Sequence, residues 1–116
     1  MHSWWRAPGL LTSSIVTDLA ALLRQHGDSP YREFFRGPAM FLGLFAAGFD
    51  HTDIQDPQGQ DEVYVVLAGH GVIDIDGRQH PVARGSISYV PCGVPHHFRG
   101  TSDNLQVLVV IAPPLA

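Results

Sequence analysis

The first strongly periodic stretch of the chain lies between residues 14 and 26. Its apolar residues recur three or four positions apart, at Ile15, Val16, Leu19, Leu22 and Leu23. This spacing predicts one short amphipathic helix, with Ser13 or Ser14 as its N-terminal cap and Gly27 as its stop. We expect the helix to cover one outer face of the domain.

After residue 36 the apolar residues form short runs that are typical of strands. Residues 39–48 predict a buried strand, in which Gly43 marks a place where a neighbour approaches closely. Residues 62–67 and 105–111 predict two more strands. Residues 31–36 fit a short strand or an irregular connection, and the pattern does not choose between them.

Turn signals separate the remaining strands. Asp76-Gly77 predicts a two-residue hairpin that joins residues 72–75 to residues 78–82. The polar residues 49–61 predict the longest loop. Short strands at short, regular intervals indicate a β-sandwich or barrel. Because several of these strands lack a polar side, we expect a second subunit to cover part of the outer face, which makes a homodimer.

Length and charge limit the possible partners. The chain has 116 residues, enough for one domain, which we divide into an arm and helix (1–36) and a barrel (37–113). Its seven basic residues are scattered arginines against eleven acidic residues, so we expect no nucleic-acid binding. The sequence shows no signal peptide and no apolar run long enough for a membrane span. With the single Cys92, this composition predicts a cytoplasmic protein without disulfides.

A dense group of glycines and prolines precedes the last strand. Pro91 and Gly93 predict a chain reversal, after which His96 and Phe98 share one face of an extended segment. Gly85, Pro91, Gly93 and His96 match the second conserved motif of the cupin superfamily at each of these positions. The closing asparagine of that motif is replaced here by a glycine.

The first cupin motif is present only in part. Glu62 and Gly69 have the spacing of its glutamate and glycine, and the amino-acid sequence of residues 61–69 is similar to that of cupins through this strand. The resemblance covers residues 38–113. It implies an all-β fold, a double-stranded β-helix or jelly-roll barrel, preceded by one short N-terminal helix.

The resemblance also implies a set of metal ligands. In metal-binding cupins, two histidines and a glutamate of the first motif and the histidine of the second hold one divalent metal ion. Here the histidine pair is missing, and two registers bring glutamine or aspartate into its place. The candidate ligands are therefore His96, Glu62, Gln58, Gln55 and Asp56. Manganese, iron, nickel and zinc are the candidate ions, and the oxygen-rich set favours manganese or iron(II) over a tetrahedral zinc site.

Other residues complete the expected site. Tyr64 and Phe98, with Phe45 or Phe41, are expected to form pocket walls. His51 is a further ligand candidate if the polar loop folds inward. The other histidines are expected outside the site: His97 faces away from His96, and His70 and His80 are exposed. Cys92 is expected to be a turn residue.

Two functions follow from this site. The first is a small cupin that binds a divalent metal ion and a small organic ligand inside the barrel, with oxygenase or isomerase as the candidate activity and Glu62 or Tyr64 as acid or base. The second is a metal-free binding or sensing module, in which Glu62 and His96 hydrogen-bond each other. The residues leave open whether the protein is an enzyme.

Overall fold

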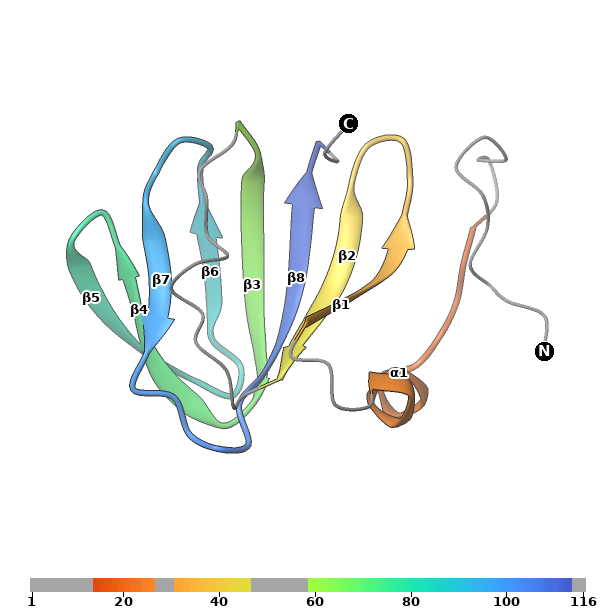
Figure 1. Cartoon of the computed structure of the whole chain (residues 1–116), viewed down its shortest axis with the longest axis horizontal. Coiled ribbons are helices and arrows are strands. Elements are labelled where there is room, and N and C mark those ends of the chain that lie inside the picture. The colour runs from red at the N-terminus through yellow and green to blue at the C-terminus, as the bar shows by residue number, and fades with distance from the viewer. Residues whose placement is uncertain (1–13, 27–30, 47–58, 114–116) are drawn as a thin grey trace.

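The computed structural model describes residues 14–26, 31–46 and 59–113, which contain one helix and eight strands (Figure 1). The elements are α1 (Leu19–His26), β1 (Tyr31–Arg36), β2 (Phe41–Ala46), β3 (Asp61–Ala68), β4 (His70–Ile75), β5 (Arg78–Ala83), β6 (Ile87–Val90), β7 (His96–Arg99) and β8 (Gln106–Ala112). All the strand pairs are antiparallel. The expected all-β jelly roll with one short helix is confirmed.

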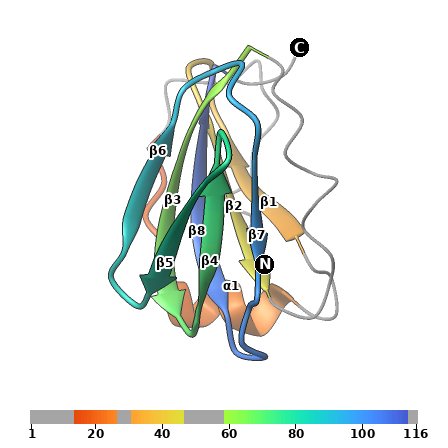
Figure 2. The ribbon, with the colours of Figure 1, turned by 90° about the vertical axis from the view of Figure 1, so that its left-hand side faces the viewer.

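The strands form two sheets. The larger has the order β1-β2-β8-β3-β6, and the smaller has the order β5-β4-β7. Figure 2 views the molecule from the side of the smaller sheet, with the larger sheet behind it. Neighbouring strands in a sheet are often far apart in the sequence; for example, β3 lies between β8 and β6.

Side chains from both sheets meet in one core. Because successive side chains of a strand point to opposite faces, β3 buries alternate residues. The main core consists of Phe45, Tyr64, Val66, Ile73, Val82, Val90, Phe98, Leu105, Val107 and Val109. This core includes Tyr64, one of the polar residues described in the next section.

The helix is shorter than the periodicity predicts. Residues 14–18 are not helical, and α1 begins at Leu19. The expected serine cap is wrong, because the carboxylate of Asp18 accepts a 2.8 Å hydrogen bond from the backbone N–H of Ala21 and so caps the first turn. Leu22 packs with Phe34 and Leu44 on the outer side of the larger sheet, as expected for a helix that covers an outer face.

Residues 31–36 form a true strand, which the sequence left open. The ring of Tyr31 in β1 lies over Gly43 in β2, where a Cβ atom would come within 2.6 Å of the Cε1 and Cζ atoms of the ring. The expected close approach at Gly43 is thus confirmed. Tyr31 also meets Phe45 edge to face, with ring centroids 5.5 Å apart, so β1 contributes an aromatic side chain to the core.

The hairpin between β4 and β5 follows its turn signal. Asp76 and Gly77 have φ values of 52° and 81°, which the two-residue turn requires, and Ile75 pairs with Arg78 across it. The hairpin brings β5 to the edge of the smaller sheet, opposite β6 at the edge of the larger sheet.

Candidate functional site

Strand β3 carries two polar side chains into the barrel. Glu62 and Tyr64 lie on its inner face, with 8% and 1% of their surface exposed. Backbone pairing with β8 on one side and β6 on the other fixes the position of β3. A carboxylate and a phenol are therefore held in a place where the surrounding side chains are apolar.

A turn before β7 brings His96 to the same place. The backbone N–H of Val94 donates to the carbonyl of Pro91 at 3.3 Å, and Gly93 takes a positive φ of 82°. The chain then enters β7 with the side chain of His96 buried. The chain reversal expected from proline and glycine is confirmed.

Hydrogen bonds fix the orientation of the imidazole ring. The Nδ1 atom of His96 lies 2.8 Å from the carbonyl oxygen of Val94. A carbonyl only accepts, so Nδ1 carries the hydrogen, and in the neutral ring the lone pair is on Nε2. Nε2 faces the interior, 2.9 Å from the hydroxyl of Tyr64 and 3.3 Å from Oε1 of Glu62.

Glu62, Tyr64 and His96 form one cluster, which we call the polar cluster. The hydroxyl of Tyr64 donates to Oε1 of Glu62. Burial and then the charge of Glu62 raise the pKa of Tyr64, so the side chain remains a phenol. Burial lowers the pKa of His96, but hydrogen bonds to Glu62 and Val94 outweigh it, and the net pKa of His96 is raised. In the absence of a metal ion, these hydrogen bonds therefore favour the protonated form of His96.

Aromatic rings enclose the polar cluster. Phe45 stacks on Tyr64 with centroids 6.0 Å apart, and Phe98 meets Tyr64 edge to face at 5.2 Å. Tyr64, Phe98 and Phe45 are part of the main core, and their expected role as pocket walls stays a prediction. Phe41 is buried outside this group, with the guanidinium of Arg36 over its ring at 4.7 Å.

Comparison with known proteins identifies the chain. The sequence pattern of the Cupin domain family matches residues 45–112. The chain belongs to the cupin family. An uncharacterized Streptomyces coelicolor protein, SCO3923, is 45% identical to this cupin over 91 residues, which are 78% of this chain and 87% of that protein.

Solved structures show the same fold. An RmlC-like cupin from Desulfovibrio desulfuricans superposes with a TM-score of 0.63 at 27% identity, covering 73% of this cupin and 82% of the other chain. Pac13, described as a unique nucleoside dehydratase and known from Streptomyces, gives a TM-score of 0.54 at 13% identity, over 75% and 79% of the two chains. At that identity the likeness to Pac13 shows the fold alone.

The structure brings together only part of the expected ligand set. Glu62 and His96, from motifs 34 residues apart, are in contact. The candidates Gln58, Gln55 and Asp56, and the alternative His51, lie outside the described residues. Within residues 14–26, 31–46 and 59–113, no three His, Cys, Asp or Glu side chains gather as a metal site.

The two described donors fit a divalent ion. Two ligand atoms about 2.1 Å from one ion, at right angles to each other, lie roughly 3 Å apart. Oε1 of Glu62 and Nε2 of His96 are 3.3 Å apart. The backbone carbonyl on Nδ1 is the type of partner that orients metal-binding histidines. The spacing of Glu62 and His96 would therefore suit two adjacent ligand positions, between which the hydroxyl of Tyr64 now bonds both side chains.

One residue near the site, Tyr31, was not expected there. The pKa of Tyr31 is raised, first by burial, then by the charge of Glu33 and then by the charge of Glu62. Tyr31 therefore lies close to Glu62. The buried amide of Gln60 donates to the carbonyl of Pro113 at 2.8 Å and joins the start of β3 to the end of β8. Gly43 was the signal for Tyr31, because a missing side chain inside a strand makes room for a ring.

The other histidines and the cysteine lie where the sequence placed them. His97 is on the opposite face of β7 from His96 and is half-buried, while His70 and His80 are exposed. Cys92 is exposed in the turn, and its backbone N–H donates to Asp61 at 2.9 Å. In the described part of the chain, no helix has the length and apolarity to cross a membrane.

Proposed function

We propose that this cupin binds a divalent metal ion through Glu62 and His96, and a small organic ligand beside it inside the barrel. The observation that carries the proposal is the pair of donor atoms, 3.3 Å apart and buried, with the imidazole already oriented by the carbonyl of Val94. An orienting partner on a histidine ligand strengthens metal binding. Further ligands are expected from residues 55–58.

The donor types limit the ion. One carboxylate and one imidazole, with amide oxygens as the expected additions, suit manganese or iron(II) better than a tetrahedral zinc site. When bound, such an ion supplies a Lewis acid or an oxygen-activating centre, which is why oxygenase and isomerase are the candidate activities.

The protein's own acid and base groups are Tyr64 and Glu62. The hydroxyl of Tyr64 is within hydrogen-bond distance of both Glu62 and His96, so a proton can pass between the three groups without a large movement. Because Tyr64 already donates its one hydrogen to Glu62, its role is to relay a proton between Glu62 and His96 rather than to donate to a ligand. The nucleoside dehydratase Pac13 shows that an enzyme can have this fold. A shared fold does not indicate the substrate of this cupin.

A metal-free ligand-binding module is the second candidate, and one observation favours it. Glu62, Tyr64 and His96 satisfy one another's hydrogen bonds, and no further group is needed to make their burial favourable. In this case the polar cluster recognises a ligand directly.

Metal analysis separates the two candidates. The untagged wild-type protein is purified beside His96→Ala and, as a matched control, His97→Ala, in which the neighbouring histidine on the opposite face is removed. We expect near-stoichiometric manganese or iron in the wild type and in His97→Ala, and a loss of at least about tenfold in His96→Ala. Equal trace metal in all three proteins would leave the metal-free module as the function.

We further propose that the protein is a homodimer. The outer face of β3 and β6 carries apolar side chains in direct cross-strand pairs, Val63 with Tyr89 and Val65 with Ile87. Ile87 and Tyr89 are 72% and 58% exposed, and large exposed apolar residues that lie together favour an interface. Light scattering tests this: a dimer mass is expected for the wild type, and a monomer at micromolar concentration would refute it.

A further inference from the structure

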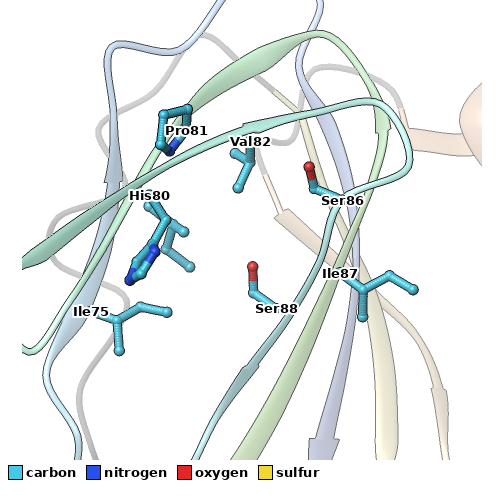
Figure 3. A pocket seen from close by; sticks show the side chains of 8 residues that line it. Ile75, His80, Pro81, Val82, Ser86, Ile87 and Ser88 are labelled. Carbon is cyan, nitrogen blue, oxygen red and sulfur yellow. The ribbon is translucent and has the colours of Figure 1, made fainter.

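A groove separates the edges of the two sheets on one side of the barrel. Strand β5 forms one wall and β6 the other, and the groove has a volume of about 360 Å³ (Figure 3). This volume lies within the range of small-molecule sites. None of the residues of the polar cluster lines the groove, so it is a second feature of the fold.

Small side chains on β6 explain why the groove exists. Ser86 and Ser88 occupy inward positions of the segment that faces β5, and Figure 3 shows them opposite His80 and Val82. The next inward position, Val90, is buried in the core. Two serines at positions where the core carries larger apolar side chains leave space that packed interiors do not otherwise keep.

The lining indicates the class of ligand. Its apolar part includes Ile73, Ile75 and Val82, and no Asp, Glu, Lys or Arg contributes to it. Ser86 Oγ accepts a 2.9 Å hydrogen bond from the backbone N–H of Ala83, so its own hydrogen can be donated to a ligand. His80 is the one ionisable side chain of the lining and is exposed, so a charged ligand would lose hydration without a buried partner of opposite sign, whereas a hydroxyl or carbonyl group would find donors.

The groove borders the polar cluster through direct strand pairing. Ser88 pairs with Tyr64 across β6 and β3, and Ile75 pairs with His96 across β4 and β7. Side chains in such pairs lie on the same face, with their Cβ atoms about 5 Å apart. A molecule in the groove is therefore adjacent to both sides of the polar cluster.

We propose that the groove between β5 and β6 binds a small, uncharged organic molecule, with its apolar part on Ile73, Ile75 and Val82 and its hydroxyl or carbonyl group on Ser86 and Ser88. This inference rests on the proposed function in one respect: the molecule in the groove is taken to be the small organic ligand that binds beside the polar cluster. Binding in the groove itself requires no metal ion.

The test is a titration followed by ¹H–¹⁵N NMR in the presence of EDTA. The probe is 2-phenylethanol, and phenylacetate and 2-phenylethylammonium serve as charged probes with the same ring. We expect saturable shifts of the backbone amides of His80, Val82, Ser86 and Ser88 with the alcohol, with an affinity in the millimolar range that suits so small a ligand. The charged probes should bind at least about tenfold more weakly.

Two variants on the same strand make the test specific. Ser88→Val fills the groove and should abolish the shifts, while Tyr89→Phe, on the opposite face of β6 and with its ring kept, should leave them unchanged. A dispersed spectrum shows that each variant is folded. No saturable shift with 2-phenylethanol, shifts away from the groove, or equal binding to Ser88→Val would overturn the proposal. Because EDTA is present throughout, these results are independent of the metal analysis above.

Discussion

Removal of one hydroxyl group tests the hydrogen-bonding cluster inside the barrel. In Tyr64→Phe the ring keeps its contacts with Phe45 and Phe98, so packing is preserved. The lost group is the hydroxyl that donates to Glu62 and lies 2.9 Å from His96 Nε2. The substitution therefore isolates the contribution of hydrogen bonding to the stability of the apoprotein.

The expected magnitude follows from the burial and charge of the partners. A hydrogen bond to a charged group contributes about 1.5–3 kcal/mol to stability. A buried carboxylate that loses its partner destabilises the folded state, because its lost hydration is no longer compensated by a hydrogen bond. Glu62 and His96 remain 3.3 Å apart and can still bond each other, which recovers part of the loss. We therefore expect a loss of about 1.5–2 kcal/mol in the free energy of unfolding.

The assay is urea denaturation in EDTA at pH 7, followed by far-UV circular dichroism. With a slope of roughly 1–2 kcal/mol per molar urea, the midpoint of Tyr64→Phe should fall by about 1 M. Tyr89→Phe, at a tyrosine that is 58% exposed, is the matched control and should change the free energy by less than about 0.5 kcal/mol. If Tyr64→Phe were as stable as the wild type, the hydrogen bonds of the Tyr64 hydroxyl to Glu62 and His96 would not contribute to stability as expected.

Three more predictions use the same unfolding assay. Gly43→Ala should destabilise the protein by about 1–3 kcal/mol, because the new methyl group collides with a tyrosine ring, and an unchanged midpoint would refute that contact. Leu22→Ala should cost about 2–4 kcal/mol if α1 packs on the larger sheet as described, whereas a loss under about 1 kcal/mol would place the helix elsewhere. The folded pKa of His96 is raised, so its contribution is complete below the unfolded pKa of about 6.5 and is lost as the pH rises through the folded value. The stability difference between wild type and His96→Gln should shrink between pH 6 and pH 9 in EDTA, and growth of that difference with pH would contradict the assignment.

Local signals indicated a β-sandwich or barrel, and the jelly roll followed from the resemblance of two motifs to the cupin family. Turn residues placed the β4–β5 hairpin, and the structure shows that alternation along β3 carries Glu62 and Tyr64 to its inner face. The start of α1 was wrong, because Asp18, inside the periodic stretch, caps the helix better than the serines before it.

The site was predictable only where sequence spacing fixes it. His96 and Glu62 are placed by motifs, and their contact follows from the way β7 and β3 face each other. The hydrogen bond from His96 to Val94 and the approach of Tyr31 depend on tertiary geometry that no local pattern contains. The register of residues 55–58 remains a prediction, since those residues lie outside the described part of the chain.

The groove between β5 and β6 was missed for a related reason. His80 was expected to be exposed, and it is, but its side chain shares a face with Ile73, its pairing partner in β4. Exposure and a position in a binding groove are compatible when two sheet edges face each other. Local sequence patterns predict individual strands, but they do not show which strands lie at the edges of the two sheets or which of these edges face each other.

Anomalous X-ray diffraction from crystals grown with manganese chloride tests the central claim most directly, because it locates the ion itself. We predict an anomalous peak about 2.0–2.3 Å from both the carboxylate of Glu62 and Nε2 of His96, with its remaining ligands showing which of residues 55–58 take part. A map without a peak there, in which the hydroxyl of Tyr64 still bonds both Glu62 and His96, would contradict metal binding at the polar cluster.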